Sequence, residues 1–269
     1  TGLVVDSSRF GANESGIYLN GDNNNRSTGT QIRQNVFGDA TLAGPDDRGI
    51  YVRYHGGGLR IEGNRLGNGP TRGIYVERTG SSGTRPLVAN NMVSVDGSNN
   101  RGIETGIETD LRVFHNAVRA TDGRSMYQSG GSSSLEVKNN IFAAGSGQAL
   151  EVDNSGSITT DYNDLYATGS VLVDWEGTDY GTLSAYQSGT GQGANSVSAD
   201  PSYASATDLM PSSPFVDNEG TDLTGTVPTD IDGTSRSTTP SLGAVEFTGP
   251  QPLAGTFTIG GSSPDYADF

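Results

Sequence analysis

A short frame centred on asparagine recurs along the first two thirds of the chain and constrains the fold more than any other feature. The six asparagines are Asn35, Asn64, Asn91, Asn116, Asn140 and Asn163, and Ser8 takes the same place in an earlier copy. From Ser8 onward, successive frames lie 27, 29, 27, 25, 24 and 23 residues apart. A recurrence at about 20–50 residues is typical of solenoid proteins, in which each repeat stacks on the next.

Apolar residues hold fixed places around each asparagine. The places three residues before it and two residues after it are mostly apolar, as at Ile61 and Leu66 around Asn64. A second segment with its own apolar places follows each frame, as in residues 49–52. Alternation of this kind describes strands with one face inward, and no segment has helical spacing long enough for a βαβ unit. We therefore predict an all-β fold, a parallel β-helix of about seven coils.

The repeated asparagines are predicted to lie inside this rod, stacked at a bend of each coil. A buried amide is costly unless its hydrogen bonds are satisfied, and stacked amides can bond one another and the backbone of the turn. This makes the ladder structural rather than catalytic, since buried polar groups are normally used in this way. Residues beside the ladder, such as Asn90, are expected to point outward and to tolerate substitution.

Composition and charge restrict the environment and the partners that are expected for the rod. Only 32% of the residues are hydrophobic and 40 are glycine, which suits a solenoid because each coil buries few residues. There is no cysteine, and no apolar run is long enough for membrane insertion. Residues 1–138 carry a net charge of +1 and residues 139–269 a net charge of −16, which sum to −15. This large negative net charge argues against nucleic acid as a partner. It favours an acidic, soluble surface in a salty extracellular medium.

The chain divides into three parts: coils in residues 1–174, a Gly/Ser/Thr/Asp-rich segment in 175–249, and a linker with strand-like residues 256–259 in 250–269. The coils resemble the right-handed parallel β-helix repeats of the pectate-lyase-like superfamily. Residues 198–201, 230–233 and 243–247 are similar to the closing segment of large secreted bacterial β-helix proteins. That resemblance implies that residues 175–249 cover the open end of the helix. Residues 255–269 look like the opening of another such unit.

Enzymes of this superfamily imply catalytic patterns that the sequence lacks. Asp6, Arg33 and Glu62 share one outward column, but their alternating signs favour an ion-pair ladder between rungs. The densest acidic group, in residues 104–110, is flanked by arginines and is typical of a solvated turn. No catalytic residue is therefore predicted. The alternative is a polysaccharide lyase or epimerase, with an acid-base cluster beside the long loops of the first four coils.

Two features could serve binding. Tyr18, Tyr51 and Tyr75 occupy one outward column on three consecutive coils, and Tyr127 follows two coils further on. Such rings could form a flat platform for sugar rings or another protein, or could simply reflect the strand propensity of tyrosine. Asp230 and Asp232 precede a glycine, so they could bind calcium or cap a turn.

These patterns predict a non-catalytic structural module of a large secreted or cell-surface bacterial protein, in an adhesin or extracellular fibre. No cofactor is expected, apart from calcium at the two aspartates. The expected partners are other copies or neighbouring units of the same protein and a cell-surface glycan, with no nucleic acid and no membrane insertion. The first coil begins without a capping helix, so we expect a neighbouring unit to cover its strand edges.

Overall fold

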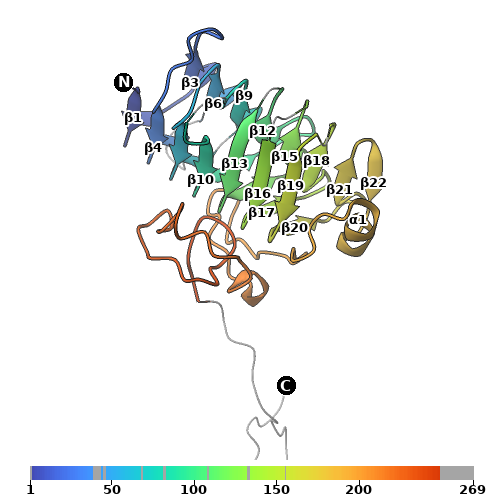
Figure 1. Cartoon of the computed structure of the whole chain (residues 1–269). Coiled ribbons are helices and arrows are strands. Elements are labelled where there is room, and N and C mark those ends of the chain that lie inside the picture. Colours follow the sequence, from blue (N-terminus) through green and yellow to red (C-terminus); the bar gives the residue numbers. More distant parts are fainter. Residues whose placement is uncertain are drawn as a thin grey trace, which may run out of the picture.

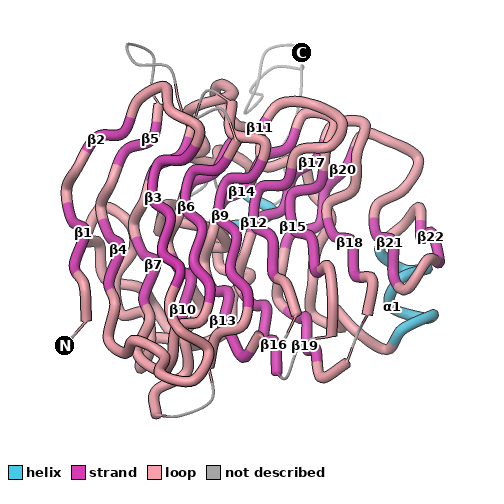
Figure 2. Tube along the Cα trace, turned by 90° about the horizontal axis from the view of Figure 1, so that it is seen from above, coloured by secondary structure: helices cyan, strands magenta, loops and turns pink. Residues whose placement is uncertain are grey.

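Three parallel sheets run the length of one rod in the computed structural model, which describes residues 2–38, 44, 47–67, 69–80, 83–107, 109–131, 134–154 and 156–248 (Figures 1 and 2). Sheet A consists of β1 (Val4–Asp6), β4 (Gln31–Arg33), β7 (Arg60–Glu62), β10 (Leu87–Ala89), β13 (Asp110–Phe114), β16 (Ser134–Lys138) and β19 (Ile158–Asp161). Sheet B consists of β2 (Arg9–Phe10), β5 (Val36–Phe37), β8 (Arg65–Leu66), β11 (Met92–Val95), β14 (Ala117–Ala120), β17 (Ile141–Ala144) and β20 (Asp164–Ala167). Sheet C consists of β3 (Ser15–Asn20), β6 (Arg48–Arg53), β9 (Arg72–Glu77), β12 (Arg101–Thr105), β15 (Arg124–Gln128), β18 (Leu150–Val152), β21 (Val173–Trp175) and the antiparallel β22 (Thr178–Tyr180). The predicted all-β parallel β-helix of about seven coils is confirmed.

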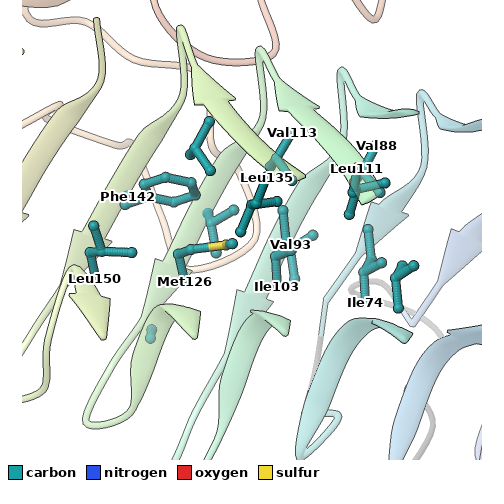
Figure 3. Packing of buried hydrophobic residues seen from close by; sticks show 14 of the residues in the cluster. Ile74, Val88, Val93, Ile103, Leu111, Val113, Met126, Leu135, Phe142 and Leu150 are labelled. Carbon is teal, nitrogen blue, oxygen red and sulfur yellow. The ribbon is translucent and has the colours of Figure 1, made fainter. Parts of the chain in front are cut away.

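Each strand pairs with its equivalent one coil on, so like residues stack. Ile32 pairs with Ile61, and Val88 pairs with Val113. These side chains are fully buried in one continuous core, which Figure 3 shows between the sheets. Because the register is constant, one apolar column of the sequence becomes one continuous apolar stripe inside the rod.

A column of glycines lets sheets B and C approach each other. A Cβ atom on Gly73 would lie 2.3 Å from the Val93 side chain and 2.5 Å from the carbonyl oxygen of Gly102. At Gly102 the same atom would lie 2.2 Å from the Val118 side chain. Side chains larger than hydrogen would overlap the core here, so glycine is required by packing rather than by backbone conformation.

The turn between sheets A and B has the same backbone geometry in every coil. The residue immediately before each ladder position has a positive φ, from 50° to 67°, at Ser7, Gln34, Gly63, Asn90, His115, Asn139 and Tyr162. This left-handed conformation bends the chain between the two sheets, and the next side chain lies inside the bend. The residue with positive φ and the buried asparagine that follows it are therefore two parts of the same turn.

A short helix closes the C-terminal end of the rod. In α1 (Leu183–Thr190), Thr182 accepts the N-terminal capping bond, and Tyr186 lies fully buried with its ring 5.7 Å from that of Trp175. The Tyr186 and Thr160 hydroxyls are 2.5 Å apart, which satisfies both inside the core. Among the described residues, no helix is long and apolar enough to cross a membrane.

Residues 203–247, which we term the lateral segment, run back along the side of the rod and not across its end (Figure 1). They cover outward apolar residues of sheets A and B, namely Leu87, Ala89, Met92, Phe114, Ala117 and Ile141. The covering of the end implied for residues 175–249 is therefore confined to α1 and the residues next to it. The predicted following unit in residues 250–269 lies outside the described residues.

The residues before the ladder asparagines fasten the lateral segment to the coils. The Asn90 amide donates to the Thr229 carbonyl (2.7 Å) and accepts from the Arg236 guanidinium (2.8 Å). Asn139 exchanges two hydrogen bonds with the main chain of Thr221. Asn90 therefore points outward as expected, but it is not a solvated residue that tolerates substitution. It is only 7% exposed, because the lateral segment covers it.

Candidate functional site

The ladder asparagines are bonded from coil to coil through the centre of the turn. In the middle of the rod, Asn64 donates its main-chain N–H (3.0 Å) and its side-chain amide (2.9 Å) to the amide oxygen of Asn91. At the first coil the main-chain N–H of Ser8 donates to Asn35, and at the last that of Asn163 donates to the Ser196 hydroxyl. The asparagines are almost completely buried, so they hold the coils together and cannot reach a substrate.

Tyrosine rings form a stack along the outer face of sheet C. The ring centroids are 4.9 Å apart between Tyr18 and Tyr51 and 4.7 Å apart between Tyr51 and Tyr75, with nearly parallel planes. Glu104 occupies the next rung, so Tyr127 stands apart from the other three. Tyr51 is only 7% exposed and Tyr18 is 50% exposed. The two faces of the Tyr51 ring are covered by the rings of Tyr18 and Tyr75.

A column of arginines runs beside this stack. It consists of Arg48, Arg72, Arg101 and Arg124, paired in register one coil apart. The Arg48 guanidinium lies 4.8 Å from the centre of the Tyr51 ring, and that of Arg101 lies 4.4 Å from the centre of the Tyr127 ring, as cation–π contacts require. In the sequence, this column is indicated by an arginine three residues before a tyrosine, in residues 48–51 and 72–75. The asparagine frame alone does not reveal it.

The tyrosine hydroxyls are held by carboxylates of the same face. Tyr51 (2.5 Å) and Tyr75 (3.0 Å) both donate to Glu77, and Tyr127 donates to Asp153 (2.5 Å). Burial and these carboxylates raise the pKa of Tyr51 and Tyr75 well above the ordinary value, and that of Tyr127 to about 12. All three hydroxyls therefore stay protonated at neutral pH and serve as donors to the protein itself.

Buried glutamates neutralise the arginine column. Glu104 lies 3.0 Å from Arg72 and 3.2 Å from Arg101, and Glu151 pairs with Arg124. Burial raises the pKa of Glu104, and the two arginines oppose that rise. A general acid or base must reach a proton on the substrate, but these carboxylates are almost fully buried and bonded to their neighbours. The face is therefore internally paired.

The charged column on sheet A is paired in a different way from the predicted ladder. Arg33 lies 2.8 Å from Asp6 on the preceding coil, as predicted, but Glu62 pairs with Arg60 of its own strand at 2.5 Å. The acidic residues of 104–110 do not gather at one place either. Glu104 belongs to sheet C, Asp110 on sheet A pairs with Arg85 at 2.7 Å, and Glu108 lies outside the described residues.

The two aspartates considered for calcium have other partners. The Asp230 carboxylate accepts main-chain N–H groups of Asp232 (2.9 Å), Thr234 (2.8 Å) and Glu246 (2.9 Å), which shapes the turn of the lateral segment. Asp232 forms an ion pair with Arg65 at 2.7 Å and so ties this turn to sheet B. Among the described residues, no group of three or more histidine, aspartate or glutamate side chains could hold a metal ion.

A family model described as Periplasmic copper-binding protein (NosD) matches residues 1–174, which are the coils. This match and the fold confirm the resemblance to parallel β-helix repeat proteins. No curated protein and no solved structure matches the chain.

The residues of this chain do not fit the copper in that family description. Copper prefers imidazole, thiolate and thioether ligands, and the chain has two histidines, three methionines and no cysteine. His55 and His115 are both buried, and His115 bonds Asn139 at 3.0 Å beneath the lateral segment. Burial and the Arg236 charge lower the pKa of His115, so its ring is neutral inside the protein. Met92 and Met126 are buried as well, so Met210 is the one potential ligand among these five that is exposed.

Proposed function

The chain belongs to the Periplasmic copper-binding protein (NosD) family, and from this premise we propose that it is a non-catalytic structural module of a protein that works outside the cytoplasm. The observation that carries the proposal is the internally paired outer face of sheet C. There each carboxylate described above bonds an arginine or a tyrosine of the same face. Carboxylates paired in this way present no free acid-base pair to a substrate.

We further propose that the module lies in the periplasm or on the cell surface, as part of an adhesin or extracellular fibre. The family description supports an envelope location, and the acidic surface, with a net charge of −15, suits an aqueous medium outside the cell. The test of the non-catalytic role is incubation of the purified chain with pectate, alginate and neutral glycans, with and without calcium. No unsaturated products and no new reducing ends are expected, and turnover of any of these polymers would contradict the proposal.

The first rung is the contact surface that best suits assembly with a neighbouring unit. Strands β1, β2 and β3 lie at the edges of their sheets. Leu3 and Val4 are 49% and 50% exposed, whereas Leu59 and Leu111, which take the place of Leu3 in later coils, are buried. Edges and apolar ends of this kind are normally covered. The proposed partners are other copies or neighbouring units of the same protein.

Light scattering over a range of protein concentrations tests this contact. The unaltered chain is expected to associate, and the double variant Leu3→Glu, Val4→Glu is expected to stay monomeric, because carboxylates at the exposed edge oppose close approach. Met210→Glu is the matched control, since Met210 is similarly exposed (45%) but belongs to the lateral segment. If the unaltered chain remains monomeric at every concentration, the first rung is not an interface.

A further inference from the structure

A groove lies at the C-terminal edge of sheet B, between two stretches of irregular chain. Residues 197–200 and 202 form one wall, residues 212–215 and Glu219 form the other, and its volume is about 670 Å³. Phe215, at 66% exposed, is the most exposed of the large apolar side chains in the part of the chain that the structure describes. Concave, mainly apolar spaces of roughly 300–1,000 Å³ are typical of sites for small organic molecules.

Both walls of the groove are held by the protein itself. Val197 donates its N–H to the Asn163 carbonyl (2.9 Å), which fixes the first wall on the last coil. In the second wall, Pro214–Val216 form one turn of 3₁₀ helix, in which Val216 is buried and Phe215 lies in solvent. The groove therefore exists before any ligand enters it, and a site built in advance loses little freedom on binding.

The two charged side chains of the groove are both carboxylates, one in each wall. Asp200 and Glu219 are exposed, and within the described ranges neither forms an ion pair with a basic side chain. Asp200 accepts the main-chain N–H of Ser202 (2.8 Å) and the Tyr166 hydroxyl (3.4 Å). Both of these donors are neutral, so the negative charge of the groove is retained.

The chain offers little basic charge to balance these carboxylates. Arg236 is the one basic residue in residues 139–269, and it is buried and paired with Glu246 at 3.2 Å. Arg119 of sheet B, which lines a neighbouring hollow together with Asp200, pairs with Asp96 at 3.4 Å. An exposed aromatic ring beside unbalanced carboxylates is complementary to a cation that also carries apolar surface.

We propose that the groove binds a small organic cation of the alkylammonium class. Its hydrocarbon chain packs along Phe215, and its ammonium group faces the carboxylates of Asp200 and Glu219. A hydrated inorganic cation suits the site less well, because it needs several oxygen ligands together. Over the described residues, no group of three or more acidic or histidine side chains supplies them. This inference does not depend on the proposed function.

Titration of the full chain with hexylammonium, followed by ligand-observed NMR, tests the proposal. Hexanol has the same chain without the charge, and hexanoate has the opposite charge. Hexylammonium is expected to bind about fivefold more tightly than hexanol, which is the size of effect that exposed charge pairs produce. Hexanoate should bind more weakly than hexanol. High salt should remove the difference between hexylammonium and hexanol, because exposed charges are screened.

Variants of the groove separate the contribution of charge from that of the aromatic ring. Asp200→Asn and Glu219→Gln should each weaken hexylammonium binding about two- to fivefold and leave hexanol binding unchanged. Phe215→Ala should weaken the binding of both probes, because it removes apolar surface. Asp208→Asn is the matched control. Asp208 accepts the main-chain N–H two residues further on, as Asp200 does, but it does not line the groove.

Equal affinities for hexylammonium and hexanol at low salt would overturn the proposal. An unchanged affinity for hexylammonium in the double variant Asp200→Asn, Glu219→Gln would overturn it too, and unchanged hexanol binding in that variant shows that the groove is intact. An alternating alanine–lysine peptide is the remaining probe. If it bound more tightly than hexylammonium and lost that binding in the double variant, the groove would serve a partner protein and not a small molecule.

Discussion

Substitution of Asn91 by leucine measures what the ladder contributes in the middle of the rod. The Asn91 amide oxygen accepts the main-chain N–H of Asn64 at 3.0 Å and its side-chain N–H at 2.9 Å. Leucine fills nearly the same space but accepts no hydrogen bond, so two buried donors lose this acceptor. Each costs about 1–3 kcal/mol, and burial of the leucine side chain returns about 2 kcal/mol. Taking about 4 kcal/mol as lost, the net destabilisation is about 2 kcal/mol.

Thermal unfolding followed by circular dichroism provides the assay. For a chain of this size, a loss of about 2 kcal/mol lowers the melting temperature by about 4–8 °C. The matched control is Asn99→Leu, an exposed asparagine outside the ladder, which should change stability by less than about 0.5 kcal/mol. Equal shifts for the two variants would refute the view that buried hydrogen bonds of the ladder stabilise the coils.

Three further substitutions test other parts of the structure by thermal unfolding. Asn90→Ser should cost about 2 kcal/mol, because it removes a partner of the buried Arg236 side chain, whereas Asn99→Ser should be nearly neutral. Gly73→Ala should cost about 1–3 kcal/mol through overlap with Val93, and Gly225→Ala, with open space around it, should not. Burial raises the pKa of Asp164 well above its ordinary value, so the folded state holds a proton that the unfolded chain loses above about pH 4. The stability of the unaltered protein should therefore fall as pH rises from about 4 through the folded-state pKa, and Asp164→Asn should remove that fall; parallel pH profiles would contradict it.

The coils could be predicted from sequence because their information is local and repeated. One asparagine frame fixes the bend, and Ile61 or Leu66 at fixed offsets fixes which face points inward. Parallel pairing in constant register then follows, since every coil offers the same strands to the next. Ser196 was harder to anticipate. It ends the ladder 33 residues after Asn163, where the regular spacing has already ceased.

The lateral segment could not be placed from sequence, because its contacts join residues far apart in the chain. Arg236 bonds Asn90 across 146 positions, and no periodicity links the two. One signal was present. Met92, Ala117 and Ile141 are apolar at an outward place, which a solvated face would not favour, and each is buried by the lateral segment. The Tyr51 ring illustrates a different limit, because a column of aromatic residues does not reveal whether ring faces or ring edges meet the solvent.

The difference between the two ends of the rod bears on how units of this kind could assemble. A solenoid grows into a fibre only if both ends present a rung, since each added unit must expose the surface that receives the next. Here the first rung presents the edges of three sheets, whereas α1 and the Ser196 rung occupy the other end. Contact between two first rungs is isologous and stops at a pair. A fibre of these modules therefore needs a second contact, and the exposed Tyr18 at the margin of sheet C lies too close to the first rung to provide one independently. Among the described residues, β22 is an edge strand of sheet C at the far end. Light scattering over a range of protein concentrations therefore separates a module that stops at pairs from one that extends into fibres.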